Sequence, residues 1–391
     1  MITFEQASEI VQSNCYLLGT EHIDFKESLN RVLRQDVVSD LDMPPFHKSA
    51  MDGYACRQED IRNTLEVIEV LPAGTQPQKS IGINQCAKIM TGAMIPEGAD
   101  CVLIVEEVEQ VSETTIRFKA ERTSANICFK GEDVIAGQTL VSTGVRITPK
   151  EIASLALAGC SSPLVSKKPI LGIIATGDEI VEPYTIPQGS QIRNTNSYQI
   201  LTQGNQFGCT TKYYGIVPDT EEAIGRVLTE ARSECHVVLL TGGVSMGDFD
   251  LVPSLLKNHG FELFFEKVAI QPGKPTVFGR SGNTFVFGLP GNPVSSFMVF
   301  EFFVKELLAG MMGLKRFSTI LKYRLTNDYK RKRSTRRAWV PVQITADGEA
   351  KALEYHGSAH ISSLAGADGV ITIPIGEREI LKGTLVDVRQ I

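Results

Sequence analysis

The chain has 391 residues, too many for one hydrophobic core, and this length predicts about two to four domains. Its composition is globular, 42% apolar and 21% charged, and the net charge of -6 argues against nucleic-acid or membrane-surface partners. No apolar run approaches the roughly 20 residues of a membrane span, and the acidic start MITFEQASEIVQ does not fit a signal peptide.

The first 168 residues predict a helical segment that a β-rich insert interrupts. An amphipathic helix is expected at residues 3–18, a helix and a strand within 24–40, and a helix at 149–160. Between them, the runs TLEVIEV, AKIM, CVLIVEEVEQV and TIRFKA predict short strands separated by turns. We therefore expect a helical or linker domain from residues 1–41 and 139–168, and an insert domain from 42–138.

Three loops of the insert carry chemically interesting residues. DMPPFHKSAMDGYA presents Asp52 either to a polar ligand or as part of an Asp-Gly turn. MTGAMIPEGAD contains Thr91, and ICFKGEDV contains Lys130, Glu132 and Asp133. Either of the last two loops can be structural, but their glycine together with Thr or Asp favours ligand contact.

Residues 169–315 predict a doubly wound α/β domain with a mainly parallel sheet, because apolar strands alternate with helical patterns. The expected strands are ILGIIA, TKYYGIV, HVVLL, ELFFEKVAI and TFVFGL, and the expected helices cover 196–206, 220–233, 248–258 and 293–310.

Polar loops follow these strands, and in a parallel sheet most of them meet at one edge, where open α/β sheets bind ligands. The loop TGGVSMG follows HVVLL and precedes a helix, a position that favours phosphate. We expect Gly242, Gly243, Ser245 and Lys274 to contact an anionic ligand. Taken alone, the loop fits equally well a tight turn with Asp248 as the helix N-cap.

Carboxylates in the same loops predict a Mg²⁺ ion beside that phosphate, because hard cations prefer oxygen ligands. The candidates are Asp178, Glu179, Asp219, Asp248 and Asp250. Asp219 also fits a helix N-cap, and Glu179 fits a solvated loop charge. Lys267 stands inside an apolar strand pattern and needs a partner or an anionic ligand.

Residues 316–391 return to a strand pattern and predict a small β-barrel or sandwich. The basic run Lys330–Arg337 fits a solvated turn or a segment that reaches an anionic ligand in a neighbouring subunit. The loop GSAHISS is small and polar, as loops that line a site often are. Eight scattered cysteines without a CxxC pair predict reduced thiols in a cytoplasmic protein, and neither a disulfide scaffold nor a zinc site.

Seven strings together resemble the MoeA family of molybdopterin molybdenumtransferases, which is similar to the E domain of gephyrin. They occur in the family's order and spacing, and the resemblance covers essentially the whole chain. The strings are PPFHKSAMDGYA, KIMTGAMIPEGAD, NICFKGEDV, ATGDEI, TGGVSMGDFD, VAIQPGKP and GLPGNPVSS. SAMDGYA and MTGAxxPxGAD are specific strings, whereas TGGVSxG also occurs in related proteins of other function.

The resemblance implies a transferase of molybdenum cofactor biosynthesis. Such enzymes use Mg²⁺ to insert molybdenum from molybdate into adenylylated molybdopterin, and they release AMP. The resemblance also implies an elongated cytoplasmic homodimer whose site lies between subunits, with other proteins of the cofactor pathway, such as a molybdopterin adenylyltransferase, as partners. The α/β domain is then a molybdopterin-binding domain.

Matching positions carry the family's site residues over to this chain. Catalytic roles are implied for Asp52, Glu179, Asp219 and Asp250, and Asp178, Glu179 and Asp250 are the expected metal ligands. The resemblance implies substrate contacts for Thr91, Asp133, Lys267, Pro290, Pro293, Arg337 and Ser358. The loop pattern described above adds Gly242, Gly243, Ser245 and Lys274.

Two departures from the family pattern remove a cation each. Cys128 stands where the family often has Arg, and Gln271 stands where it often has Lys. Lys130 and Lys274 are the nearest candidates to compensate. The losses leave open a non-catalytic scaffold of the same fold, and the α/β domain alone would also suit a molybdopterin adenylyltransferase.

Overall fold

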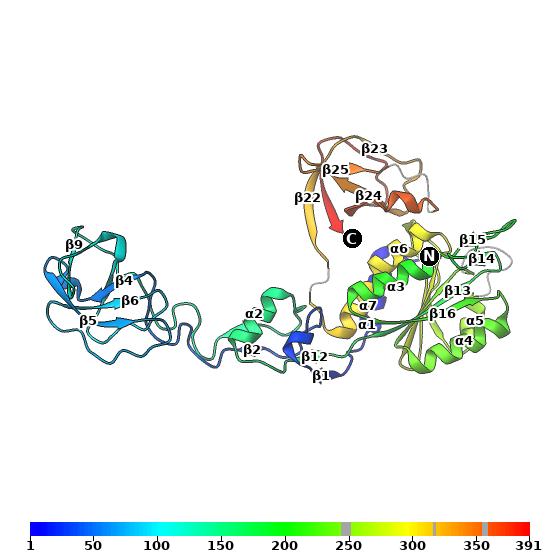
Figure 1. The fold of residues 1–391 in the computed structure, drawn as a ribbon. Coiled ribbons are helices and arrows are strands. Elements are labelled where there is room, and N and C mark those ends of the chain that lie inside the picture. The colour runs from blue at the N-terminus through cyan, green and yellow to red at the C-terminus, as the bar shows by residue number, and fades with distance from the viewer. Residues whose placement is uncertain (244–251, 316–317, 354–358) are drawn as a thin grey trace. The chain divides into compact units, whose positions relative to one another are not determined.

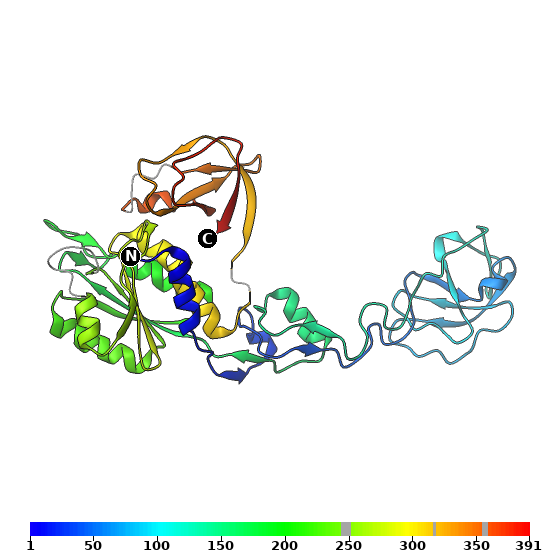
Figure 2. The ribbon, with the colours of Figure 1, turned by 180° about the vertical axis from the view of Figure 1, so that it is seen from behind.

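The computed structural model describes residues 1–243, 252–315, 318–353 and 359–391, and the chain forms two compact units. Unit 1 comprises Met1–Gln35, Thr143–Thr148 and Pro163–Ile391, and unit 2 comprises Asp36–Ser142 and Pro149–Ser162. Figures 1 and 2 show their elements from two sides. Within the described ranges, no helix has both the length and the apolar character needed to cross a membrane.

A six-stranded sheet lies at the centre of unit 1, in the order β16-β13-β17-β21-β20-β18. Neighbours among β16, β13, β17 and β21 are parallel, whereas β20 is antiparallel to both of its neighbours. The sequence prediction of a mainly parallel sheet is thus confirmed. The strands are β13 Ile170–Thr176, β16 Thr210–Val217, β17 Val237–Thr241, β18 Glu262–Phe265, β20 Val277–Ser281 and β21 Thr284–Leu289.

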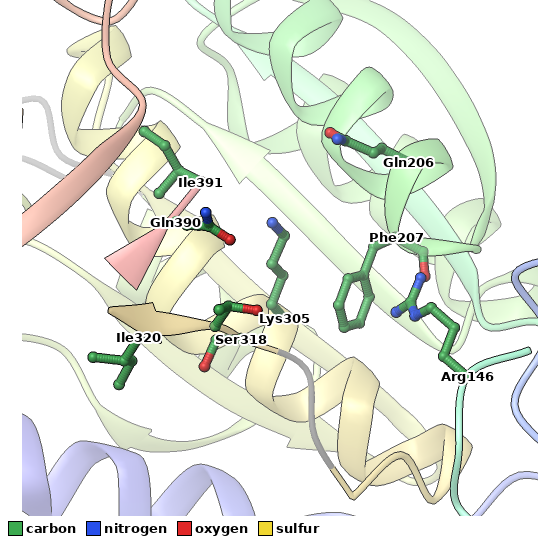
Figure 3. A pocket seen from close by; sticks show the side chains of 9 residues that line it. Arg146, Gln206, Phe207, Lys305, Ser318, Ile320, Gln390 and Ile391 are labelled. Atoms are coloured by element: carbon green, nitrogen blue, oxygen red, sulfur yellow. The ribbon is translucent and has the colours of Figure 1, made fainter. Parts of the chain in front are cut away.

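Helices cover both faces of this sheet, because alternate residues of the apolar strands point to opposite sides. Leu239 faces the core beneath α1, α3, α6 and α7, and Leu240 faces the core beneath α4 and α5. The helices are α1 Phe4–Asn14, α3 Asn196–Phe207, α4 Glu221–Glu234, α5 Val252–Asn258, α6 Pro293–Val299 and α7 Lys305–Met312. A π-helical turn, η4 Phe300–Val304, joins α6 to α7, and a pocket lies where α3 ends and α7 begins (Figure 3).

The last part of unit 1 is a closed five-stranded barrel, because the ring β24-β25-β22-β28-β26 returns to β24. Its strands are β22 Ile320–Leu325, β24 Arg337–Ile344, β25 Glu349–Ala352, β26 Gly369–Ile373 and β28 Leu385–Gln390. The buried Trp339 ring stacks on Phe302 at 4.0 Å and meets Phe4 edge-on at 5.6 Å. This aromatic contact, together with the pairing of β19 with β24, joins the barrel to the α/β part.

The short elements of unit 1 complete its connections. They are β1 Thr20–His22, η1 Phe25–Glu27, β12 Leu164–Ser166, β14 Ile180–Val181, β15 Ile192–Arg193, β19 Ile270–Gln271, β23 Tyr329–Lys330, η5 Ile361–Ser363 and β27 Glu379–Ile380.

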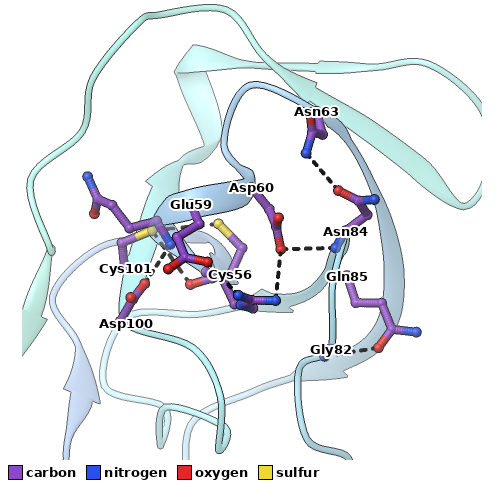
Figure 4. A network of polar contacts seen from close by, with 11 residues as sticks. Cys56, Glu59, Asp60, Asn63, Gly82, Asn84, Gln85, Asp100 and Cys101 are labelled. Atoms are coloured by element: carbon purple, nitrogen blue, oxygen red, sulfur yellow. Dashed lines mark hydrogen bonds and ion pairs between the residues drawn. The ribbon is translucent and has the colours of Figure 1, made fainter.

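Unit 2 is built on a second six-stranded sheet, in the order β7-β4-β6-β5-β9-β8. Between β4 and β5 in sequence, the buried Asp60 carboxylate accepts a hydrogen bond from the Asn84 amide at 3.0 Å and lies 3.7 Å from Arg57 Nη1 (Figure 4). The elements are β2 Val37–Val38, β3 Lys48–Ser49, β4 Gly53–Cys56, η2 Gln58–Asp60, β5 Thr64–Leu71, β6 Gln85–Ile89, β7 Cys101–Ile104, η3 Val105–Glu107, β8 Val108–Gln110, β9 Thr115–Phe118, β10 Ile127–Cys128, β11 Thr139–Val141 and α2 Pro149–Leu157.

Four predicted elements differ from the structure. CVLIVEEVEQV is not one strand, because η3 divides it into β7 and β8. The helix expected at residues 3–18 ends at Asn14, where Cys15 turns to an extended backbone. Residues 24–40 form only the turn η1 and the two-residue strand β2. ELFFEKVAI is not one strand, because the chain leaves the sheet after Phe265 and re-enters pairing at Ile270, against the barrel.

Candidate functional site

The predicted convergence of strand-end loops is present in unit 1, around a cavity of about 530 Å³. β13 contributes Thr176, β17 contributes Thr241, and the loop after β21 contributes Pro290. These groups lie together because parallel strands end at the same edge of a sheet. The remaining walls come from Glu179, Ile180, β15, the starts of α3 and α6, Gly242, Pro275, Pro293, Ala359 and Ile361. We call this hollow the strand-end cavity.

Gly242 permits the close approach of two of these strand ends. Its φ of 99° is unfavourable for other residues, and a Cβ here would lie 2.4 Å from the Thr176 carbonyl oxygen. Its own N–H donates to the Leu289 carbonyl at 3.3 Å. Gly242 therefore allows the strand ends to pack closely at this edge of the sheet. Its amide already donates a hydrogen bond to Leu289. Gly243 also has a positive φ, 61°.

Acidic residues gather beside the cavity at the ends of β13 and β16. Glu179 lines the cavity, and Asp178 Oδ1 accepts a hydrogen bond from the Asp219 amide at 3.3 Å. Burial raises the pKa of Asp219, and the negative charges of Asp178 and Glu179 raise it further. The N-cap of α4 is Thr220, which accepts from the Ala223 amide, so the prediction of Asp219 as N-cap is wrong.

The described residues do not provide a complete set of metal ligands around these acids. Within the same residues, no group of three or more His, Cys, Asp and Glu side chains is arranged to hold a metal ion. Asp250, an expected metal ligand, lies outside the described residues, as do Asp248, Ser245 and Ser358. Ala359 and Ile361, which follow Ser358, do line the strand-end cavity.

The cationic candidates occupy different places. Lys267 lies in the connection between β18 and β19, half-buried, so the prediction that it stands inside a strand is wrong. Lys274 precedes the lining residue Pro275. Arg337 forms an ion pair with Glu5 and lies 5.0 Å above the Phe4 ring, and it is not part of the cavity wall. In the basic run, Arg331 donates to three barrel carbonyls, which gives it a structural role.

Sequence reasoning missed a polar wall formed by Arg193, Asn194 and Asn196. The Asn196 amide donates to the Gly291 carbonyl at 2.8 Å, and Asn194 donates to the Tyr213 hydroxyl at 2.8 Å. Tyr213 in turn donates to Glu182. The string IRNTN, which places Arg193 and Asn194 directly before α3 and Asn196 at its first position, is the sequence signal that could have identified this wall.

In unit 2, the structure brings Asp52 and Thr91 together. Asp52 Oδ1 accepts from the Thr91 amide at 2.7 Å and from its hydroxyl at 3.1 Å, and both residues are exposed. Backbone bonds hold the surrounding strings, since Gly92 donates to Ser49 at 2.8 Å and Ala50 donates to Asn126 at 2.9 Å. Three of the motif strings therefore form one surface, which we call the Asp52 surface.

The string NICFKGEDV places its residues at the Asp52 surface. Asp133 is exposed, with its amide bonded to the Met43 carbonyl at 3.0 Å. The backbone hydrogen bond from Ala136 holds the pKa of Asp42 below its usual value, and the Lys130 ammonium, 3.4 Å from Asp42, lowers it further. Lys130 is thus already partnered. Strand β10 sets Cys128 directly opposite Lys48 of β3, so a different lysine lies beside the position where the family often has Arg.

The cysteines agree with the predicted reduced state, because all eight are free and five are buried. Burial raises the pKa of Cys209 to about 12 and that of Cys86 to about 12. Buried thiols of this kind are poor nucleophiles and metal ligands.

Comparison with known families covers nearly the whole chain. Residues 2–159 match the MoeA N-terminal region (domain I and II), residues 172–310 a probable molybdopterin binding domain, and residues 322–391 the MoeA C-terminal region (domain IV).

Named relatives and solved structures agree with these matches. A molybdopterin molybdenumtransferase of Staphylococcus epidermidis is 35% identical, over 94% of this chain and 90% of that protein, and that of Bacillus subtilis is 33% identical, over 94% and 89%. The crystal structure of a molybdopterin biosynthesis moeA protein from Pyrococcus horikoshii OT3 superposes with a TM-score of 0.86 at 29% identity, covering 100% of both chains. The chain therefore belongs to the MoeA family, as the resemblance of its seven motif strings implied.

Proposed function

We propose that this chain is a molybdopterin molybdenumtransferase of molybdenum cofactor biosynthesis, which inserts molybdenum from molybdate into adenylylated molybdopterin and releases AMP. The observation that carries the proposal is the meeting of the TGDE, TGG and GLPGNP loops around one 530 Å³ cavity. That volume suits a small organic ligand. The names of relatives at 33–35% identity over most of the chain support the same activity.

Negative charge enters the site in two steps of the proposed reaction, the binding of molybdate and the cleavage of the adenylyl phosphoanhydride. Cations and hydrogen-bond donors must neutralise that charge. The cavity offers groups that can bind oxyanions. These are Arg193 and Asn196 on its wall and Lys274 beside it. Glu179 and Asp219 are the carboxylates we assign to catalysis here, and Asp52 is the corresponding carboxylate of the Asp52 surface.

We propose Mg²⁺ as the metal, held by Asp178, Glu179 and Asp250. The donor set of carboxylates fits a hard ion. Burial raises the pKa of Asp219, the charges of Asp178 and Glu179 raise it further, and a nearby cation would relieve that like-charge repulsion. When bound, the ion would neutralise charge on the phosphoanhydride oxygens.

We further propose that the protein works in the cytoplasm as a homodimer and receives its pterin from a molybdopterin adenylyltransferase. Eight free cysteines, with burial raising the pKa of Cys86 and Cys209, support a reducing compartment. The family relationship supports the partner, because the substrate must be adenylylated before it arrives.

The first test is AMP release from adenylylated molybdopterin and Mg²⁺, measured with and without molybdate. We expect release that depends on molybdate and yields active cofactor. Tight binding of the pterin without release would contradict the proposal and favour a scaffold.

Two variants test the assigned carboxylates. Asp52→Ala and Glu179→Ala should each lower kcat by at least about 10²-fold, the usual effect of removing a group that acts on the transition state. Both side chains are exposed, so the melting temperature should change little. Asp347→Ala, an exposed acid in a barrel turn, is the matched control and should keep full activity. Full turnover in the Asp52 or Glu179 variant would refute the site assignment.

A further inference from the structure

A second cavity of unit 1, of about 760 Å³, lies between the end of α3, the start of α7 and both ends of the barrel chain (Figure 3). Its wall shares no residue with the strand-end cavity. It is lined by Arg146, Gln206, Phe207, Lys305, Ser318, Thr319, Ile320, Gln390 and Ile391. We call it the Arg146 cavity.

Two cations share one aromatic ring in this cavity. The Arg146 guanidinium carbon lies 4.7 Å from the Phe207 ring centre, and the Lys305 nitrogen lies 5.7 Å from it. The two charges are therefore within about 10 Å of each other. Like charges at this distance repel each other weakly, and an anion bound between them relieves that repulsion.

Among the side-chain carboxylates of the described residues, an ion pair reaches only one of these charges. Glu301 is buried and binds Lys305 at 2.6 Å and the Gln203 amide at 2.8 Å, which uses both of its oxygens. Arg146 donates to the Phe207 carbonyl at 3.2 Å, and no ion pair of the described chain involves it. Burial lowers the pKa of Arg146, as expected for a cation that has lost water without gaining a carboxylate.

The rest of the wall combines polar and apolar groups. Ser318, Thr319 and Gln390 offer hydroxyl and amide donors, and Ile320 and Ile391 offer apolar surface. Figure 3 shows Lys305 and Gln390 on one side of the open space and Phe207 and Arg146 on the other. The volume exceeds what an inorganic oxyanion needs and lies in the range of small-molecule sites.

We propose that the Arg146 cavity binds a phosphate monoester, with the phosphate between Arg146 and Lys305 and the organic part against Ile320 and Ile391. Guanidinium and ammonium groups are the side chains that phosphate recognition uses most, the first as a fork and the second as a point charge. This site is separate from the catalytic assignment and does not depend on it.

Site-resolved labelling of the full-length protein tests the proposal. Phenylglyoxal modification of Arg146 is followed by peptide mass spectrometry, with AMP, inorganic phosphate or adenosine as the probe. AMP at about four times its Kd should slow labelling of Arg146 about fivefold by simple competition. Inorganic phosphate should protect at higher concentration, and adenosine should not. Arg226, an exposed arginine outside the cavity, should be labelled at an unchanged rate.

Variants at the cavity rim test whether AMP protects Arg146 from labelling through its phosphate or only by covering the cavity. Gln206→Glu adds a negative charge at an exposed lining residue without touching Glu301, so AMP should protect several-fold less well. Gln188→Glu, the same change at an exposed site elsewhere in unit 1, should leave protection intact. Lys305→Gln should weaken protection and Lys305→Arg should retain it. Equal labelling with and without AMP, or equal protection by adenosine, would overturn the proposal.

Discussion

Asp219, which we propose as a catalytic residue, is a single residue whose ionised side chain lowers the stability of the folded state. Burial raises its pKa, and the charges of Asp178 and Glu179 raise it further. An acid with a raised pKa favours the folded state most when it is protonated, so its contribution is lost as the pH rises through the folded pKa. Above that pKa the ionised side chain therefore opposes folding, which agrees with the catalytic role that we propose for Asp219.

Asp219→Asn should for this reason raise the melting temperature at pH 7.5, and the gain should shrink as the pH falls through the raised pKa of the wild-type acid. Molybdenum insertion by the variant should fall sharply. Thermal unfolding across this pH range measures the first effect, with Asp347→Asn as the exposed control. A melting temperature lower than wild type at pH 7.5 would contradict the prediction.

Strand pairing decides which side chains meet at the Asp52 surface. Directly opposed residues of an antiparallel pair point to the same face, so β3 and β10 set Lys48 beside Cys128. Of the two lysines expected to replace the missing cations, Lys130 is held by Asp42. Lys48 is therefore the better candidate to supply the charge that an arginine at position 128 would otherwise give.

Lys48→Gln should raise KM for molybdate about tenfold, the effect of losing one charge-assisted contact. Adding Cys128→Arg to this variant should restore most of the affinity, because the guanidinium would return the charge to the same face. Steady-state kinetics at varied molybdate concentration measure both, with Lys88→Gln, an exposed lysine of β6, as the control. An unchanged KM in the Lys48 variant would show that this cation is not used.

The whole chain distributes its motif residues over two compact units. Glu179 and the strand-end cavity belong to unit 1, whereas Asp52 and Thr91 belong to unit 2. A homodimer offers each unit a counterpart from the other copy, and two-fold symmetry would then create two equivalent sites.

Mixing two inactive variants tests that arrangement. If each site uses Asp52 of one copy and Glu179 of the other, Asp52→Ala and Glu179→Ala copies mixed at random should regain about a quarter of wild-type activity, since half of the dimers hold one intact site. Refolding or co-expression of the two variants, with each variant alone as the control, gives the measurement. No regained activity in verified mixed dimers would mean that one copy supplies both residues.

Much of the α/β part was predictable because its information is local. HVVLL and TFVFGL are apolar on both faces, as expected for strands that helices cover on both sides. In the structure, alternate residues of these strands lie in two different hydrophobic cores, one on each face of the sheet. The expected meeting of the strand-end loops followed from parallel order alone. ELFFEKVAI failed because its apolar residues serve two partners, the sheet through Phe265 and the barrel through Ile270.

Other features depended on contacts between residues far apart in the chain. Nothing near Cys128 in sequence identifies Lys48 as its neighbour, and nothing near Arg146 indicates that it shares the Phe207 ring with Lys305. Strand periodicity and the family strings could be recognised in the amino-acid sequence because each is a property of a short segment. Composition needs no structure at all, because it is a count over the whole chain. Pairing partners, ion-pair choices and cavities arise only when packing brings distant segments together, and no local pattern records them.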